Sequence, residues 1–174
     1  MEKYMNELVD ILKMKSPTGH TQEAINYLEK RFRELGLMTY RNNKGALIAK
    51  LEGIEVNREV TLAAHIDTLG AMVKDITADG KIRLTQLGGY AWSTIEGEYV
   101  EIETIDGKFY SGTVVTDFAS SHVHGAKTSN EKRTEHNLHI RLDEKITSKK
   151  DVLSLGINVG DFVHLDPRVQ RTES

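Results

Sequence analysis

The chain has 174 residues, of which 39% are hydrophobic and 28% are charged. This balance is typical of a globular protein and excludes a long coiled coil or a wholly disordered chain. The 23 basic and 26 acidic residues give a net charge of −3, which offers no basic field for a nucleic-acid partner. The absence of cysteine excludes disulfides, thiolate nucleophiles and cysteine-bound metals.

The first residues, MEKYMNELVDILKM, carry charges between their apolar positions and so lack the apolar stretch of a signal peptide. No run of 18 apolar residues occurs in the sequence, so we expect no transmembrane helix and no membrane partner. These two features lead us to expect a soluble protein of the cytoplasm.

Two amphipathic helices are predicted at the start of the chain. The first spans about the first dozen residues and is followed by a turn at residues 16–19. The second begins near Thr21, a suitable N-cap, and ends before Gly36. The apolar residues of the first helix recur at helical spacing: Met5, Leu8, Val9 and Leu12. The second helix is expected to bury one apolar stripe, which consists of Ile25, Leu28, Phe32 and Leu35.

A pair of short strands follows, over residues 37–41 and 46–51, joined by the turn NNKG. Residues 60–64, VTLAA, are almost wholly apolar, as expected of a strand covered on both faces. Two helices followed by these strands predict the beginning of an α/β domain.

From about residue 70 the pattern changes to short strand-like runs separated by glycine turns. Runs of this length and spacing predict a small β-barrel or sandwich, and the polar, histidine-bearing residues 120–137 are expected to form a long loop. The fold class is therefore α/β, with a β-barrel-like domain inserted after the first 70 residues. The expected strands are residues 71–76, 81–86, 99–104, 109–115, 138–142 and 161–165.

His65 and Asp67 are the best candidates for a functional site. They end the apolar run 60–64, and ligands of open α/β sheets gather at the carboxyl ends of strands. Residues i and i+2 of an extended segment point to the same side, so the two side chains can converge. A metal-bound imidazole is commonly held by a carboxylate on its other nitrogen. A hydrogen-bonded pair without a metal would show the same pattern.

The segment LAAHIDTLGAMV resembles the first metal-ligand segment of the dinuclear glutamyl/deblocking, or tetrahedral, aminopeptidases. The preceding SPTGHTQEAINYLEKRFRELG and NNKGALIAKLEG resemble that family's opening helix and hairpin. The final GINVGDFVHLDPR resembles the segment that closes its inserted β domain. The resemblance covers essentially the whole chain, as an N-terminal half.

The resemblance implies a metal-dependent aminopeptidase that removes N-terminal residues from short peptides. It makes His65 a ligand of one of two divalent ions, which could be zinc, cobalt or manganese, and Asp67 the catalytic-site carboxylate that orients His65. It also implies a homo-oligomer, a twelve-subunit tetrahedral particle. The implied domains are the N-terminal part of the peptidase domain (residues 1–70), a β insert for oligomerisation and the pocket (71–165), and a return segment (166–174).

Two departures from the family pattern stand out. Thr68 occupies a position where the family commonly has glutamate. The family's other ligands and its general base have no counterpart here, so we expect these 174 residues to be inactive without a missing C-terminal half or a partner chain. The alternative is a non-catalytic oligomerisation module built on the same fold.

Weaker candidates are the pair His122 and His124, with His136 and His139 nearby, and the pair His164 and Asp166. The first group could chelate a metal, although loop histidines are usually solvated. Tyr90 and Trp92, beside two glycines in an expected loop, could pack in a subunit contact or line a pocket, and packing is the favoured alternative. Glutamates alternate at positions 96, 98, 101 and 103; a glycosidase carboxylate pair is a remote reading, and a solvated strand face is the simpler one.

Overall fold

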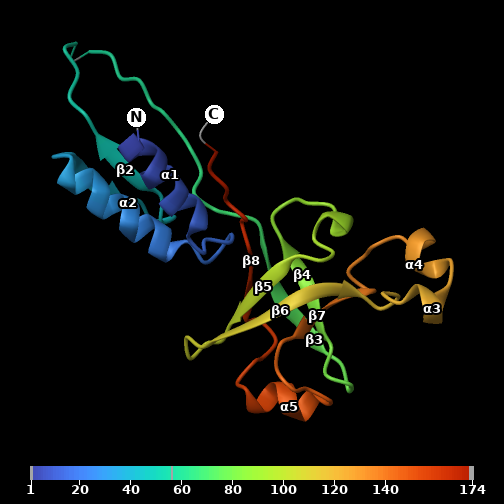
Figure 1. Ribbon diagram of the computed structural model, residues 1–174. Coiled ribbons are helices and arrows are strands. Elements are labelled where there is room, and N and C mark those ends of the chain that lie inside the picture. Colours follow the sequence, from blue (N-terminus) through green and yellow to red (C-terminus); the bar gives the residue numbers. More distant parts are fainter. Residues whose placement is uncertain (1, 56, 173–174) are drawn as a thin grey trace. The chain divides into compact units, whose positions relative to one another are not determined.

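The computed structural model describes residues 2–55 and 57–172. The chain divides into two compact units, residues 1–67 and residues 68–174, and each is described by itself. Figure 1 colours the chain from the blue helices of the first unit to the green, yellow and red strands of the second.

The first unit contains two helices and a hairpin, as the sequence predicts. Its elements are α1 (Glu2–Lys13), α2 (Gln22–Glu34), β1 (Met38–Arg41) and β2 (Leu47–Lys50). The two strands pair antiparallel, with Met38 opposite Lys50, and α2 packs against both. The side chain of Asn42 closes the turn between them by accepting hydrogen bonds from the N–H groups of Lys44 and Ala46.

Helix α2 ends just before Gly36, as the sequence predicts. This residue has φ +80°, a conformation that only glycine adopts without strain. Its N–H donates to the carbonyl of Arg33 (2.9 Å), and the N–H of Leu37 donates to that of Phe32 (3.0 Å). These two bonds form a Schellman motif, which satisfies carbonyls that the helix end leaves open.

The predicted apolar stripes are only partly covered. Among the described residues α1 buries no side chain and α2 buries Ala24 alone, while Leu35 is 63% exposed. The prediction that Leu35 is buried is wrong, because helical spacing shows which face is apolar but not whether another layer covers it. Apolar residues also stay exposed in α1, in β1 and beyond β2: Tyr4, Met5, Leu8, Leu12, Met38, Tyr40, Leu51 and Ile54.

The predicted buried strand over residues 60–64 is not formed. The segment is extended but has no ladder partner within the described ranges, and Val60 and Leu62 are 86% and 94% exposed. A strand needs neighbouring backbone to satisfy its N–H and C=O groups, and β1 and β2 pair only with each other. An apolar sequence alone therefore does not make this segment a strand.

The second unit is built on a closed six-stranded antiparallel barrel, which confirms the predicted inserted β-barrel. The strands follow each other around the barrel in the order β3-β4-β7-β6-β5-β8, and β8 closes it against β3. Closure removes the unpaired edges that an open sheet would expose. The strands are β3 (Gly70–Ile76), β4 (Ile82–Leu87), β5 (Tyr99–Glu103), β6 (Phe109–Thr116), β7 (Leu138–Leu142) and β8 (Phe162–Leu165).

The barrel core follows the two-residue period of the strands. Val100 and Ile102 of β5 are buried, for example, whereas Glu101 between them is exposed. A bulge between Val73 and Asp75 shifts the register of β3 by one residue. The shift turns Asp75 outward and lets Ile76 join the core, which a strict alternation would not allow.

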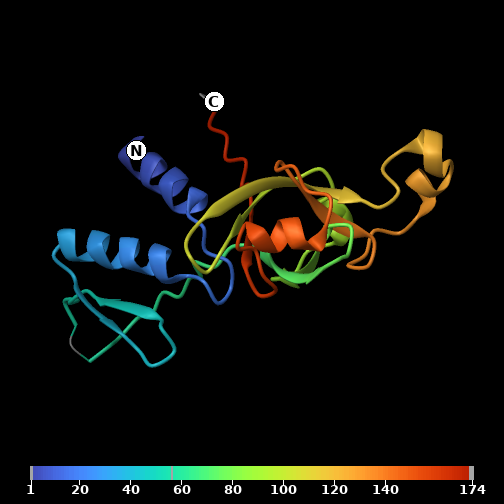
Figure 2. The ribbon, with the colours of Figure 1, turned by 90° about the horizontal axis from the view of Figure 1, so that it is seen from below.

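Several short helices accompany the barrel. The helix α5 (Lys149–Ser154) covers one side of it in Figure 2 and contributes Val152 to the core. The 3-10 helix η1 (Trp92–Thr94) carries Trp92, whose ring meets that of Tyr90 edge to face, and both pack against the barrel core. The sequence indicated neither helix.

The segment predicted as a loop at residues 120–137 instead contains two single-turn helices, α3 (Ser121–His124) and α4 (Lys127–Asn130). Figures 1 and 2 show them projecting away from the barrel. Residues 118–137 are called the arm below.

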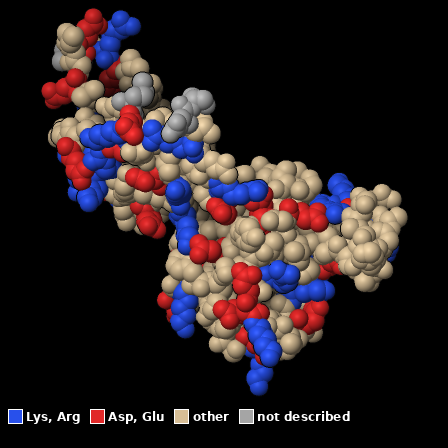
Figure 3. All heavy atoms as spheres, viewed as in Figure 1, with Lys and Arg blue, Asp and Glu red and all other residues tan. Residues whose placement is uncertain are grey.

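Basic and acidic side chains are intermingled on the surface visible in Figure 3. No helix within residues 2–55 and 57–172 is long and apolar enough to cross a membrane.

Candidate metal centre

His65 and Asp67 lie together, although the segment that carries them is not a paired strand. The Nδ1 atom of His65 is 3.1 Å from the backbone carbonyl oxygen of Asp67 and 3.2 Å from its carboxylate Oδ1. The i, i+2 spacing therefore brings the two side chains together in extended backbone, as the sequence predicts.

The contacts of His65 decide which ring nitrogen can bind a metal. A carbonyl oxygen only accepts hydrogen bonds, so a bond from Nδ1 to the Asp67 carbonyl places the ring proton on Nδ1. The lone pair of the neutral ring then lies on Nε2. Because the His65 side chain is 85% exposed, Nε2 is accessible.

Asp67 has a second partner that sequence reasoning did not identify. The hydroxyl of Thr18 donates to its Oδ2 at 2.7 Å, across 49 positions of the chain. This hydrogen bond, together with the neighbouring His65, holds the pKa of the Asp67 carboxyl below its usual value. The carboxylate is therefore charged at neutral pH, the state in which it best orients an imidazole.

The residue types fit a metal centre in part. An imidazole with Nε2 exposed and Nδ1 held by a carboxylate is the common arrangement of a histidine that binds zinc or a similar ion. The fit stops at one ligand, since no group of three potential ligands within the described residues includes His65.

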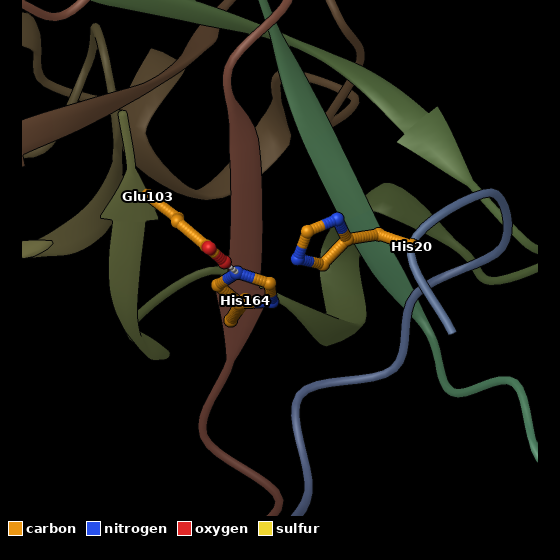
Figure 4. A group of neighbouring side chains, drawn as sticks. All are labelled: His20, Glu103 and His164. Carbon is orange, nitrogen blue, oxygen red and sulfur yellow. Dashed lines mark hydrogen bonds and ion pairs between the residues drawn. The ribbon is translucent and has the colours of Figure 1, made fainter. Parts of the chain in front are cut away.

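A second histidine–carboxylate pair lies on the barrel. Nε2 of His164 in β8 is 2.7 Å from Oε2 of Glu103 in β5 (Figure 4). His164 is buried at 5% exposure, and its partner on the strand is Glu103 rather than Asp166. The expected pair of His164 and Asp166 is not formed, because the imidazole contacts Glu103 of the neighbouring strand while Oδ1 of Asp166 accepts a hydrogen bond from the N–H of Arg168 at 2.9 Å.

A third polar cluster joins β4, β7 and the residue that follows β6. Nδ1 of His139 in β7 is 3.0 Å from Oδ1 of Asp117, and the same carboxylate accepts a 2.7 Å hydrogen bond from Arg83 of β4. Burial is the main reason that the pKa of His139 lies below its usual value. His139 is thus a neutral barrel residue, removed from the loop histidines with which the sequence grouped it.

Comparison with known proteins adds to this geometry. The sequence pattern of the M42 glutamyl aminopeptidases matches residues 45–174, three quarters of the chain, including His65 and Asp67. The chain belongs to the M42 glutamyl aminopeptidase family. The resemblance that the sequence motifs indicate is therefore confirmed.

One relative in this family is the protein YhfE of Bacillus subtilis. The two are 46% identical over all 174 residues of the chain, which correspond to 50% of YhfE. The chain thus spans about half the length of the curated relatives it matches.

Solved structures share the fold. An aminopeptidase from the archaeon Desulfurococcus kamchatkensis superposes with a TM-score of 0.84 at 22% identity, over 99% of this chain and 46% of that one. The TET1 peptidase of Pyrococcus horikoshii, which can assemble into a tetrahedron or a large octahedral shell, gives 0.69 at 23% identity over 92% and 46% of the two chains. At this identity the likeness establishes the M42-type fold.

In this M42 chain the arm does not bring its histidines together as a chelate. His122 is exposed, and His124 stacks edge to face on Phe118, with ring centroids 5.4 Å apart. The Nζ atom of Lys127 also lies over the Phe118 ring, 5.5 Å from its centroid. No three-ligand group within residues 2–55 and 57–172 contains either histidine.

The four alternating glutamates do not form a glycosidase pair. Glu96 forms a two-pronged ion pair with Arg133 of the arm, at 2.5 and 3.2 Å, and Glu98 pairs with Arg168. Glu103 contacts His164, and Glu101 is exposed. The expectation of a uniformly solvated face is also wrong, because Glu96, Glu98 and Glu103 contact Arg133, Arg168 and His164.

Thr18 and Asp117 are two polar residues that sequence reasoning missed. Thr18 lies in a Ser-Pro-Thr-Gly turn, whose composition indicated only a chain break. Asp117 directly follows β6, and no hydrophobic periodicity in the sequence distinguished it. Both owe their roles to partners distant in sequence, which no local pattern encodes.

Proposed function

We propose that this chain provides the first part of the active site of a metal-dependent aminopeptidase that removes N-terminal residues from short peptides. Membership of the M42 family supports the activity. The observation that carries the site assignment is the contact of His65 Nδ1 with the backbone carbonyl oxygen and the carboxylate Oδ1 of Asp67, which leaves Nε2 of this exposed side chain available.

In this proposal His65 binds one of two divalent ions through Nε2, and Asp67 keeps the imidazole in the required tautomer and orientation. Two such ions, which could be zinc, cobalt or manganese, would lower the pKa of a shared water and polarise the scissile carbonyl. Asp67 stays negatively charged at neutral pH and so increases the basicity of the imidazole it contacts.

The remaining ligands and the general base come from further chain in this proposal, either a C-terminal half or a partner. No motif of the 174 residues matches them, and the M42 relatives are about twice as long. The first unit also exposes apolar side chains on α1, β1 and residues 60–62, a surface suited to such a partner. The 174-residue chain alone is then inactive, and residues 166–174 lead toward the further chain.

The barrel unit is proposed to serve assembly. The Pyrococcus horikoshii peptidase that shares this fold assembles into large shells, and by analogy we propose a homo-oligomer, a twelve-subunit tetrahedron, in the cytoplasm. The alternative is that the chain acts only as a non-catalytic oligomerisation module, in which His65 has lost its role.

The test uses aminoacyl-p-nitroanilides with added Co²⁺ or Zn²⁺. The 174-residue chain is compared with a chain extended by the downstream coding sequence, and each is prepared with and without His65→Ala. The matched control is His136→Ala, whose side chain is also about four-fifths exposed. We expect metal-dependent activity only in the extended chain, reduced more than about 100-fold by His65→Ala and unchanged by His136→Ala.

Two results would contradict the proposal. Activity of the 174-residue chain by itself would show that it already holds all the ligands. An extended chain that assembles but remains silent with every metal would favour the oligomerisation module.

A further inference from the structure

We infer that Thr18 is a positioning residue of this centre, which fixes the orientation of His65 through Asp67. The inference rests on the proposed function for the metal-binding role of His65, but the arrangement Thr18–Asp67–His65 is a property of the first unit alone.

The carboxylate of Asp67 is held from two sides. Its Oδ2 accepts the 2.7 Å hydrogen bond from the Thr18 hydroxyl, and its Oδ1 lies 3.2 Å from Nδ1 of His65. A carboxylate with a single contact can rotate about the Cβ–Cγ bond, since that torsion is broad. The Thr18 hydroxyl opposes this rotation and keeps Oδ1 directed at the imidazole.

The backbone around Thr18 is held by contacts of its own, separate from the hydrogen bond of the side chain. The N–H of His20 donates to the carbonyl of Pro17 at 2.8 Å, which closes a four-residue turn with Thr18 and Gly19 at its centre. Gly19 has φ +91°, as the third position of a type II turn requires. Ser16 and Pro17 are buried and anchor the start of the turn.

The role of Thr18 is orientation rather than stability. Its side chain is exposed, and a solvent-accessible hydrogen bond contributes little to the free energy of folding because water competes for both partners. Replacing the hydroxyl by a methyl group of similar shape should therefore leave the fold intact while freeing the carboxylate.

The first test measures geometry without any activity. The 174-residue chain is labelled with ¹⁵N in its histidine rings, and the ratio of the two neutral His65 tautomers is read by NMR above pH 8. We expect Thr18→Val to lower the ratio of the Nδ1–H tautomer to the Nε2–H tautomer at least about two-fold, because the Nδ1 contact selects the Nδ1–H form. Thr18→Ser should restore the ratio. Thr61→Val, an exposed threonine of the same segment as His65, is the control.

The second test uses the extended chain. Thr18→Val should lower kcat about 3- to 10-fold with KM unchanged, a smaller loss than the 10- to 100-fold expected for Asp67→Asn, whose side chain contacts the ligand directly. Thr18→Ser should recover most of the activity.

The outcomes separate the inference from the proposed function. If Thr18→Val changes the tautomer ratio but the extended chain has no activity, the positioning role of Thr18 is supported and the proposed aminopeptidase function is contradicted. An unchanged ratio and unchanged kcat in Thr18→Val would overturn the inference, whatever the activity. If the valine variant fails to fold, as judged by its amide spectrum, Thr18→Ala carries the same test.

Discussion

Arg83 and Asp117 form a 2.7 Å ion pair at the point where the arm leaves the barrel. The same guanidinium donates to the carbonyl of Leu138, where the chain returns. The backbone N–H of Asp117 also donates to the carbonyl of Asn137 at 2.8 Å. Arg83 thus joins both ends of a twenty-residue excursion, and the arm leaves the barrel from a fixed base.

Loss of this clamp should loosen the arm. We expect Arg83→Met to lower the free energy of unfolding by about 1.5–3 kcal/mol, because it removes hydrogen bonds to a charged group. Tryptic cleavage at Lys127 and Lys132 of the arm should become several-fold faster. Arg141→Met, an exposed arginine of β7, is the control and should change neither. Equal cleavage rates in the two variants would contradict the clamp.

His139 should make the barrel sensitive to acid. Its pKa is lowered mainly by burial and further by Arg83 and Lys81, against the opposing effects of Asp117 and Asp79. The unfolded chain, with a histidine pKa of about 6.5, then binds a proton more readily than the folded one. The contribution of His139 is full above that pH and is lost as the pH falls below it.

Urea unfolding between pH 5 and pH 8 measures this contribution. As the pH falls through 6, the unfolding free energy of the wild type should decrease relative to that of His139→Gln. A difference that does not vary with pH would refute the assignment.

Gly112 should tolerate no side chain. A Cβ atom placed there would lie 2.7 Å from the backbone oxygen of Arg141 and 2.7 Å from Cγ2 of Ile140, closer than real contacts allow. We expect Gly112→Ala to destabilise the barrel by about 1–3 kcal/mol, as overpacking does. Gly89→Ala, where nothing lies within 4 Å, should be nearly neutral in the same thermal melts.

Asp151 should stabilise α5 only while it is charged. Its Oδ2 accepts from both the N–H and the hydroxyl of Thr147, at 2.9 Å each, and its own N–H donates to the N-cap Ser148. These bonds lower the pKa of the carboxyl, so their contribution is present at neutral pH and is lost as the pH falls through the folded-state value. Asp151→Asn should lower the melting temperature at pH 7 but not near pH 2. The exposed Glu144→Gln should lower it at neither pH.

The elements that the sequence predicts well depend on neighbours in the chain. Gly36 ends α2 because a positive φ is needed one residue past the helix, and the glycine can be recognised from its position. Residues 138–142 were predicted as a strand with the correct bounds, because their apolar residues alternate and turns flank them. The bulge in β3 breaks that alternation at Asp75, and no local rule marks it.

The candidate site likewise contains one contact that the sequence predicts and one that only the structure shows. The pair His65 and Asp67 follows from i, i+2 spacing in extended backbone, so sequence reasoning finds it. Thr18 is 49 residues away and reaches Asp67 only because the turn at residues 17–20 folds beside it. The apolar run at residues 60–64 was misjudged for a related reason: burial and strand pairing depend on what lies beside a segment.

The sequence by itself determined the two helices, the hairpin, the run of barrel strands, the M42 resemblance and the contact between His65 and Asp67 in the candidate metal centre. All of these depend on residue types and spacings within a few positions, where backbone geometry relates sequence to structure directly. Only the tertiary structure decided that the strands close in the order β3-β4-β7-β6-β5-β8, that His139 is buried beside Asp117, and that Thr18 holds Asp67. These relationships join residues far apart in the chain, and their free energy comes from packing and desolvation that exist only once the fold has formed.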